Sequence, residues 1–153
     1  MTGPSQSPSS TAAPTAAQSG LQRALAAEQQ AAFGYALIGP HVAPARTDAV
    51  RAAQALHEDL RDRVAGLLAA ASVEPAAPLG DYPALYPKLS RPLALAATLE
   101  DACTAGWRFA FATATAVAGR RQAQQQLTAA AVRATRWRLL AGDATPITAF
   151  PGI

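Results

Sequence analysis

Three ionisable residues sit where apolar core residues are expected, and each is of a type that can bind metal ions or transfer protons. Glu28, His57 and Glu100 stand in the middle of apolar stripes whose members are three, four or seven residues apart. That spacing places residues on the inward face of an amphipathic helix. A carboxylate buried alone costs several kcal/mol, or its pKa shifts until it is neutral. Both glutamates therefore need partners inside the protein.

Basic and hydroxyl side chains on the same helices can supply these partners. An arginine fork can hold a carboxylate through two hydrogen bonds. Such a network need not raise stability, and it can instead fix the register of the helices. We therefore predict a metal-free, buried polar network that contains Glu28, Tyr35, His57, Arg61, Glu100, Arg133 and Arg136.

A di-metal site is the alternative chemistry for inward-facing carboxylates. Such a site takes one Glu from each of two helices and a Glu-x-x-His motif from each of the other two. Glu28 and Glu100 match the single glutamates, but Arg61 stands three residues after Glu58 where the histidine would be. Residues 102–142 contain no Asp, Glu or His. We predict no metal and no cofactor; the residual ligands for one zinc or iron ion are Glu28, His57 and Glu100.

Four helices are expected to position these residues, and the chain is predicted to be all-α. Thr47 and Ser90 are expected N-caps, while Gly119 and Gly142 are expected helix ends. The first and second helices, and likewise the third and fourth, are joined by short loops, so each pair should form an antiparallel hairpin. The predicted helices cover residues 22–38, 48–71, 92–118 and 120–141.

The long connection at residues 72–89 decides the topology. At ~3.3 Å per extended residue it can reach about 55 Å, whereas a helix of 24 residues is about 36 Å long. The segment can therefore cross a whole four-helix bundle, and we expect the third helix to run parallel to the first. This short, long, short order of connections is that of ferritin-like bundles. An up-down-up-down bundle with a floppy middle loop is the rival; packing of the crossover is predicted from Tyr82, Leu85 and Tyr86.

The positions of the two turns predict which residues face each other. A turn near Ala43 places Glu28 opposite His57. A turn near Gly119 places Glu100 opposite residues 136–139.

Several stretches make the chain similar to a known family. They read LQRALAAEQQAAFGYALIG in the first helix, HEDLRDRVAGLL in the second, LEDACTAGWR in the third and AAAVRATRWRLLAG in the fourth, followed by FPGI. Over residues 20–153 the chain resembles a bacterial ferritin-like domain family of unknown function. The resemblance implies a ferritin-like four-helix bundle without an established activity. The positions it carries over are Glu28, Tyr35, His57, Arg61, Glu100, Arg133 and Trp137.

Composition limits the remaining function classes. A chain of 153 residues suits one domain, here residues 20–153 after a Ser/Pro/Ala-rich tail at 1–19 that we expect to be disordered. Cys103 is the only cysteine, which excludes an intrachain disulfide and a cysteine-based zinc site. The net charge is +3, but the arginines of the fourth helix do not share one face, so nucleic-acid binding is not predicted. Neither a membrane span nor a secretory signal is expected, which predicts a cytoplasmic protein.

These features predict a non-catalytic ferritin-like protein with a structural or partner-binding role, self-associating as a dimer. The alternative is a degenerate mono- or di-metal oxidase, or a bundle that binds a small molecule. Nucleic-acid protection ranks third. The C-terminal segment is apolar for a tail, and we expect Ile147, Phe150 and Ile153 to dock on the same chain.

Overall fold

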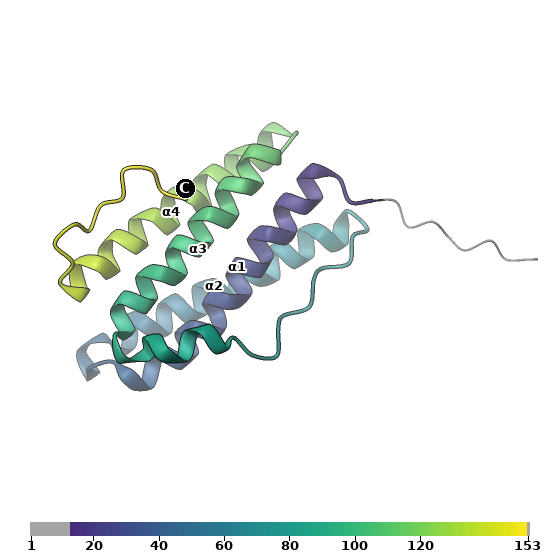
Figure 1. Ribbon diagram of the computed structural model, residues 1–153. Coiled ribbons are helices and arrows are strands. Elements are labelled where there is room, and N and C mark those ends of the chain that lie inside the picture. Colours follow the sequence, from purple (N-terminus) through teal and green to yellow (C-terminus); the bar gives the residue numbers. More distant parts are fainter. Residues whose placement is uncertain (1–12, 153) are drawn as a thin grey trace, which may run out of the picture.

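Four long α-helices make up most of the computed structural model, which describes residues 13–152 (Figure 1). They are α1 (Ala16–Ile38), α2 (Thr47–Ala70), α3 (Pro92–Thr113) and α4 (Val117–Ala141). The 3₁₀ helices η1 (Gly39–His41) and η2 (Pro44–Arg46) connect α1 to α2, and η3 (Pro83–Ser90) precedes α3. The described residues contain no strand, so the all-α prediction is confirmed. Most of the predicted tail, residues 1–12, lies outside this range, as does Ile153.

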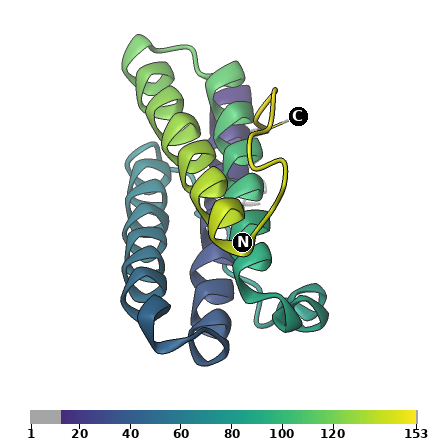
Figure 2. The same ribbon diagram turned by 90° about the vertical axis from the view of Figure 1, so that its left-hand side faces the viewer.

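The crossover returns the chain to the end of the molecule where α2 began. Gly20, near the start of α1, faces Thr113 at the end of α3, and Gly34, near the end of α1, faces Leu99. Helix α3 is therefore antiparallel to α1 and parallel to α2 (Figures 1 and 2). The prediction that it runs parallel to α1 was wrong. A connection that spans the full length of α2 must start the next helix in the direction of α2.

Three helix boundaries differ by more than one residue from the predicted ones: the start of α1, the end of α3 and the start of α4. Helix α1 begins at Ala16 because Thr15 and Gln18 form a capping box: the Thr15 hydroxyl accepts from the Gln18 N–H at 3.2 Å, and the Thr15 N–H donates to Gln18 Oε1 at 2.7 Å. The predicted domain start at residue 20 thus falls inside a helix. Helix α3 ends at Thr113, and Gly119 lies within α4. The turn between α3 and α4 therefore comes earlier than predicted.

Of the other predicted helix caps, only Gly142 is confirmed. Thr47 is the first residue of α2 and not its N-cap, and Arg91 rather than Ser90 precedes α3. Gly142 ends α4 as predicted, with a φ of 77° in the left-handed region that glycine tolerates best.

The crossover is held on α1 by glutamine side chains. Gln22 donates to the carbonyl of Glu74 at 2.7 Å and accepts from the N–H of Ala76 at 2.9 Å. Gln29 donates to the carbonyl of Ala76 at 2.7 Å. These contacts give hydrogen-bond partners to extended backbone that has no partner strand, and they attach residues 74–76 of the crossover to α1. Tyr82 and Leu85 are buried as predicted, whereas Tyr86 is 45% exposed and bonds only to Asp81.

Helices α1 and α3 form the middle of the molecule. Helix α2 packs on α1 and α4 packs on α3, while α2 and α4 pack much less closely on each other. Figure 2 shows α2 and α4 diverging toward the end of the molecule where α2 begins. No described helix combines the length and apolar character that a membrane crossing needs. The open seam between α2 and α4 is the main departure from even packing of four helices.

Glycine allows the close approach of α1 and α3, and a matched pair of substitutions tests this. A Cβ on Gly20 would lie 2.2 Å from Thr113 Oγ1 and 3.0 Å from Ala110 Cα. Gly20→Ala is therefore expected to lower the free energy of unfolding by about 1–3 kcal/mol. Gly66 lies in α2 with open space around it, so Gly66→Ala should stabilise by about 0.5–1 kcal/mol. Urea unfolding measures both, and equal effects would contradict the packing argument.

Candidate functional site

The centre of the molecule holds a histidine between two carboxylates. Glu28 of α1, His57 of α2 and Glu100 of α3 are all fully buried. His57 Nδ1 lies 2.6 Å from Glu28 Oε2, and His57 Nε2 lies 3.1 Å from Glu100 Oε1. The apolar stripes of the three helices converge here because each presents its polar residue at the same height. The imidazole thus bridges two carboxylates from two different helices.

Glu100 is the most heavily bonded member of this network. The Tyr35 hydroxyl donates to its Oε1 at 2.8 Å. Arg133 of α4 donates from Nε to both carboxylate oxygens, at 3.0 and 2.9 Å. Tyr35 also stacks on His57, with ring centroids 5.2 Å apart and planes 14° from parallel. Glu100 therefore ties all four helices together.

Glu28 has a second partner that the sequence did not reveal. Trp107 of α3 donates its indole N–H to Glu28 Oε1 at 2.6 Å. Trp107 follows Glu100 by seven residues, two helical turns along the same face of α3, but this spacing does not show that the indole would bond to a carboxylate. Cys103 lies between them, with its Sγ 3.9 Å from His57 Nδ1. Every buried side-chain N or O among residues 13–152 has a hydrogen-bond partner.

Two predicted members lie outside the network. Arg61 donates to Asp62 at 2.7 Å and its side chain is 37% exposed, so it belongs to the surface of α2. Arg136 is exposed on α4. Because α3 and α4 turn before Gly119, the residue level with Glu100 is Arg133, one turn earlier than predicted. The other five predicted residues, Glu28, Tyr35, His57, Glu100 and Arg133, are hydrogen-bonded together.

The hydrogen bonds define the charges of the network. Both ring nitrogens of His57 face carboxyl oxygens of glutamates, so with both carboxyls ionised both nitrogens donate and the ring is an imidazolium. Burial alone lowers the pKa of His57, but hydrogen bonds to Glu100 and Glu28 outweigh it and raise that pKa to about 9. Burial opposes ionisation of Glu100, yet His57 and Arg133 hold its pKa below the usual value. The charges of two carboxylates, one guanidinium and one imidazolium sum to zero.

The neighbouring thiol and phenol stay protonated. Burial, followed by the charge of Glu28, raises the pKa of Cys103 well above that of a free thiol. Burial, followed by the charge of Glu100, likewise raises the pKa of Tyr35. Neither group is therefore a ready nucleophile or base at neutral pH.

The residues present do not fit a di-metal centre. Glu28 and Glu100 lie where two bridging carboxylates could lie. Helix α4, however, contributes Arg133, whose Nε donates to both oxygens of Glu100. Among the described residues, the group that could hold one ion is Glu28, His57 and Cys103, whose ligand atoms lie within 4.8 Å of one another; it has Cys103 where the predicted set had Glu100. These types suit zinc. However, Glu28 already accepts from Trp107, and the thiol would have to lose a strongly held proton.

Comparison with known proteins gives a family and a solved relative. The family model described as "Domain of unknown function (DUF4439)" matches residues 20–153. The chain is similar to the crystal structure of a conserved hypothetical protein, rv2844, from Mycobacterium tuberculosis. The two are 29% identical with a TM-score of 0.78, and the match covers 89% of this chain and 97% of that one. No curated protein matches.

Proposed function

This chain belongs to the family of domains of unknown function DUF4439, and we propose that it is a ferritin-like four-helix bundle that has lost the di-metal ligand set. In this proposal the protein has a non-catalytic, structural or partner-binding role. The observation that carries it is the Arg133 side chain on both oxygens of Glu100, at 3.0 and 2.9 Å. A guanidinium in that place supplies the positive charge that a metal ion would otherwise supply.

Further support comes from the neutrality of the network. The charges of His57 and Arg133 balance those of Glu28 and Glu100, so a divalent cation would add uncompensated positive charge to a buried site. The buried polar side-chain atoms of residues 13–152 are also already paired with one another or with the backbone. The network therefore serves to fix the four helices in one register.

Metal analysis of the whole chain tests the proposal. Protein purified without chelator and then incubated with iron, manganese or zinc is expected to retain well under one equivalent per chain after desalting. A matched Arg133→Ala variant removes the competing guanidinium and should retain more. Retention of about one or more ions by the unmodified chain would overturn the proposal, and would favour the alternative of a mono- or di-metal oxidase.

We also propose that the protein is cytoplasmic and self-associates as a dimer. The C-terminal segment returns along α3, where Arg108 donates to the carbonyl of Gly152 at 3.2 Å. Its large side chains nevertheless stay outside: Ile147 is 77% exposed and Phe150 is 71% exposed. This differs from the expected docking of those side chains on the same chain, and exposed apolar groups of this size favour a second copy. Light scattering on the protein purified for metal analysis measures its mass in solution, and the mass of two chains is expected.

A further inference from the structure

The open seam between α2 and α4 contains an apolar groove of about 310 Å³. We call it the α2/α4 groove. Helix α2 lines it from Ala49 to Leu56, about 10 Å along the axis at 1.5 Å per residue. Small side chains on α2 leave this space because they do not reach across to α4. The full lining is Ala49, Ala52, Ala53, Leu56, Arg133, Arg136, Trp137 and Leu140.

Arg133 links the groove to the buried network. Only its Nε bonds to Glu100, and in the described part of the chain its two terminal nitrogens have no hydrogen-bond partner. The side chain is 18% exposed and lines the groove, so these terminal N–H groups are available there. A guanidinium fixed through Nε is a preorganised donor for an anion.

Arg136 adds a charge that no carboxylate offsets. It lines the groove one turn after Arg133 and forms no ion pair within residues 13–152. Positions three apart on a helix lie on the same face, so both guanidinium groups border the same space. Because Glu100 already neutralises Arg133, the groove carries about one net positive charge. That balance suits a single carboxylate better than a dianion.

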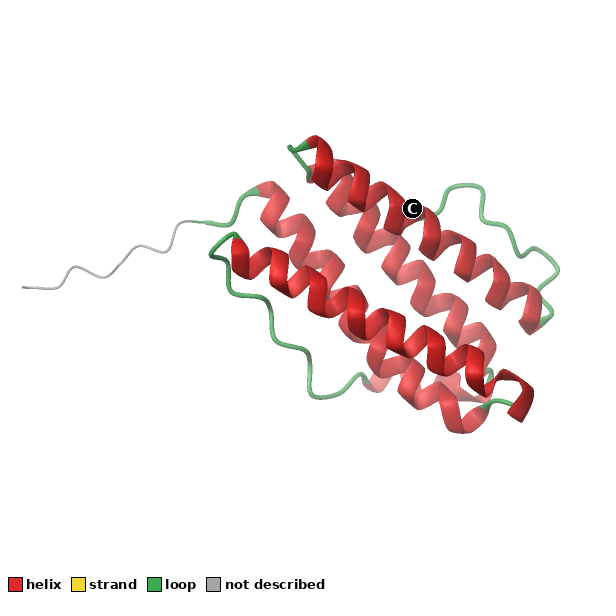
Figure 3. Ribbon diagram, turned by 180° about the vertical axis from the view of Figure 1, so that it is seen from behind, coloured by secondary structure: helices red, strands yellow, loops and turns green. Residues whose placement is uncertain are grey.

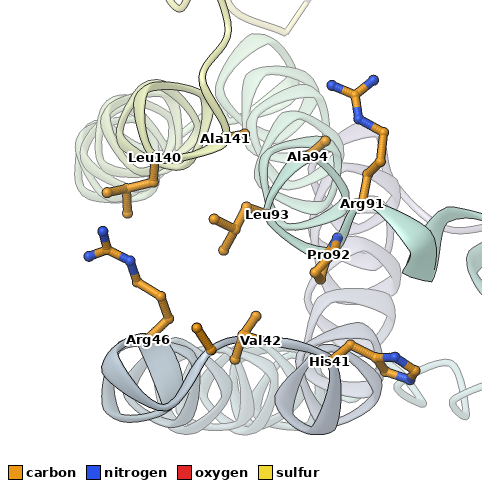
Figure 4. Close-up of a pocket in the computed structure, with 10 residues that line it drawn as sticks. His41, Val42, Arg46, Arg91, Pro92, Leu93, Ala94, Leu140 and Ala141 are labelled. Carbon is orange, nitrogen blue, oxygen red and sulfur yellow. The ribbon is translucent and has the colours of Figure 1, made fainter.

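A second cavity lies next to the groove at the end of the molecule, where apolar side chains line it together with His41, Arg46 and Arg91. It has a volume of about 370 Å³ and shares Leu140 with the α2/α4 groove. Figure 4 shows Leu93, Val42 and Leu140 around this space, with the Arg46 side chain extending toward Leu140. Neither cavity has an Asp or Glu among the described residues that line it.

We infer that the α2/α4 groove binds a carboxylic acid with an extended apolar body, of the fatty-acid class. The carboxylate lies against the terminal nitrogens of Arg133 and the guanidinium of Arg136. The apolar chain lies along the alanines of α2 toward Leu140. Binding sites of this kind are mostly apolar, with a few placed polar groups that fix orientation. The inference rests on the proposed function in one respect, because a metal ion on Glu100 would displace Arg133.

Calorimetric titration of the whole chain with dodecanoate tests the inference, with 1-dodecanol and acetate as comparison ligands. Dodecanoate is expected to bind, and dodecanol to bind about tenfold or more weakly because it lacks the charge. Acetate should not bind detectably because it lacks the apolar body. Equal affinity for acid and alcohol, or no binding of dodecanoate, would overturn the inference.

Two variants locate the ligand. Arg136→Gln should weaken dodecanoate binding about tenfold, whereas Arg121→Gln, an exposed arginine of α4 outside the groove, should not change it. Ala52→Phe should abolish binding by filling the groove. If a second copy covers the groove instead, dodecanoate will not bind and Ala52→Phe will reduce the mass measured by light scattering. Metal analysis tests the metal-free network independently of dodecanoate binding. A failure of the proposed function is therefore distinguishable from a failure of the proposed ligand site.

Discussion

Replacement of Glu100 by alanine is expected to lower the free energy of unfolding by about 3–5 kcal/mol. The substitution leaves the Arg133 guanidinium and the His57 imidazolium without their shared counter-charge. It also removes the acceptor for the Tyr35 hydroxyl. Buried donors that lose their acceptor retain the full cost of desolvation. Chemical denaturation at neutral pH measures the change.

The neighbouring Asp101 provides the matched control. Its carboxylate bonds to Arg138, but it is 46% exposed, so solvent screens the pair. Asp101→Ala should therefore cost about 1 kcal/mol or less. Glu100→Gln keeps the side-chain volume and separates charge from cavity: a loss close to that of the alanine variant would assign the effect to charge. If the Glu100 and Asp101 alanine variants were equally stable, the network would not hold the helices together.

Stability is expected to fall by about 3 kcal/mol between pH 6 and pH 9 because of His57. Its pKa rises from 6.5 to about 9 on folding. A group with a raised pKa contributes fully below its unfolded pKa, and the contribution is lost as pH rises through the folded value. The groups that face the ring are Glu28, Glu100, Tyr35 and the Cys103 thiol. Urea unfolding at a series of pH values gives the curve.

Two measurements isolate His57 from other titrating groups. NMR of the ring should show it still protonated at pH 8, which a histidine with an ordinary pKa would not be. His41 is the only other histidine and it is exposed, so His41→Gln should leave the curve unchanged. The series stops at pH 9 because the raised pKa of Cys103 adds its own loss above that. A flat curve would mean that His57 is neutral and that one carboxyl carries the proton.

Acid should destabilise the protein through Glu100. The pKa of Glu100 is lowered on folding, so its contribution is present above the ordinary carboxyl pKa. That contribution is lost as pH falls through the lowered value. The stability maximum is therefore expected between the titration of Glu100 on the acid side and that of His57 on the alkaline side.

The sequence by itself determined the four helices and named five residues of the central network, Glu28, Tyr35, His57, Glu100 and Arg133. Helical periodicity is local, so the stripes that contain Glu28, His57 and Glu100 could be read directly from their spacing. The short loop between the first two helices also fixed which residues face each other there, because each residue of a hairpin is a counted distance from the turn.

Tertiary structure alone decided the partners on the other side. The turn after α3 comes a few residues before Gly119, so that Arg133 lies beside Glu100 while Arg136, also predicted for the network, is exposed. The indole N–H of Trp107 reaches Glu28 only because α1 and α3 are antiparallel and in close contact. The groove between α2 and α4 likewise arises from the spacing of two helices that no local pattern encodes. The identity and spacing of side chains are properties of a single helix. The level at which two side chains meet, the contact between two helices and the groove left between them depend on how pairs of helices pack.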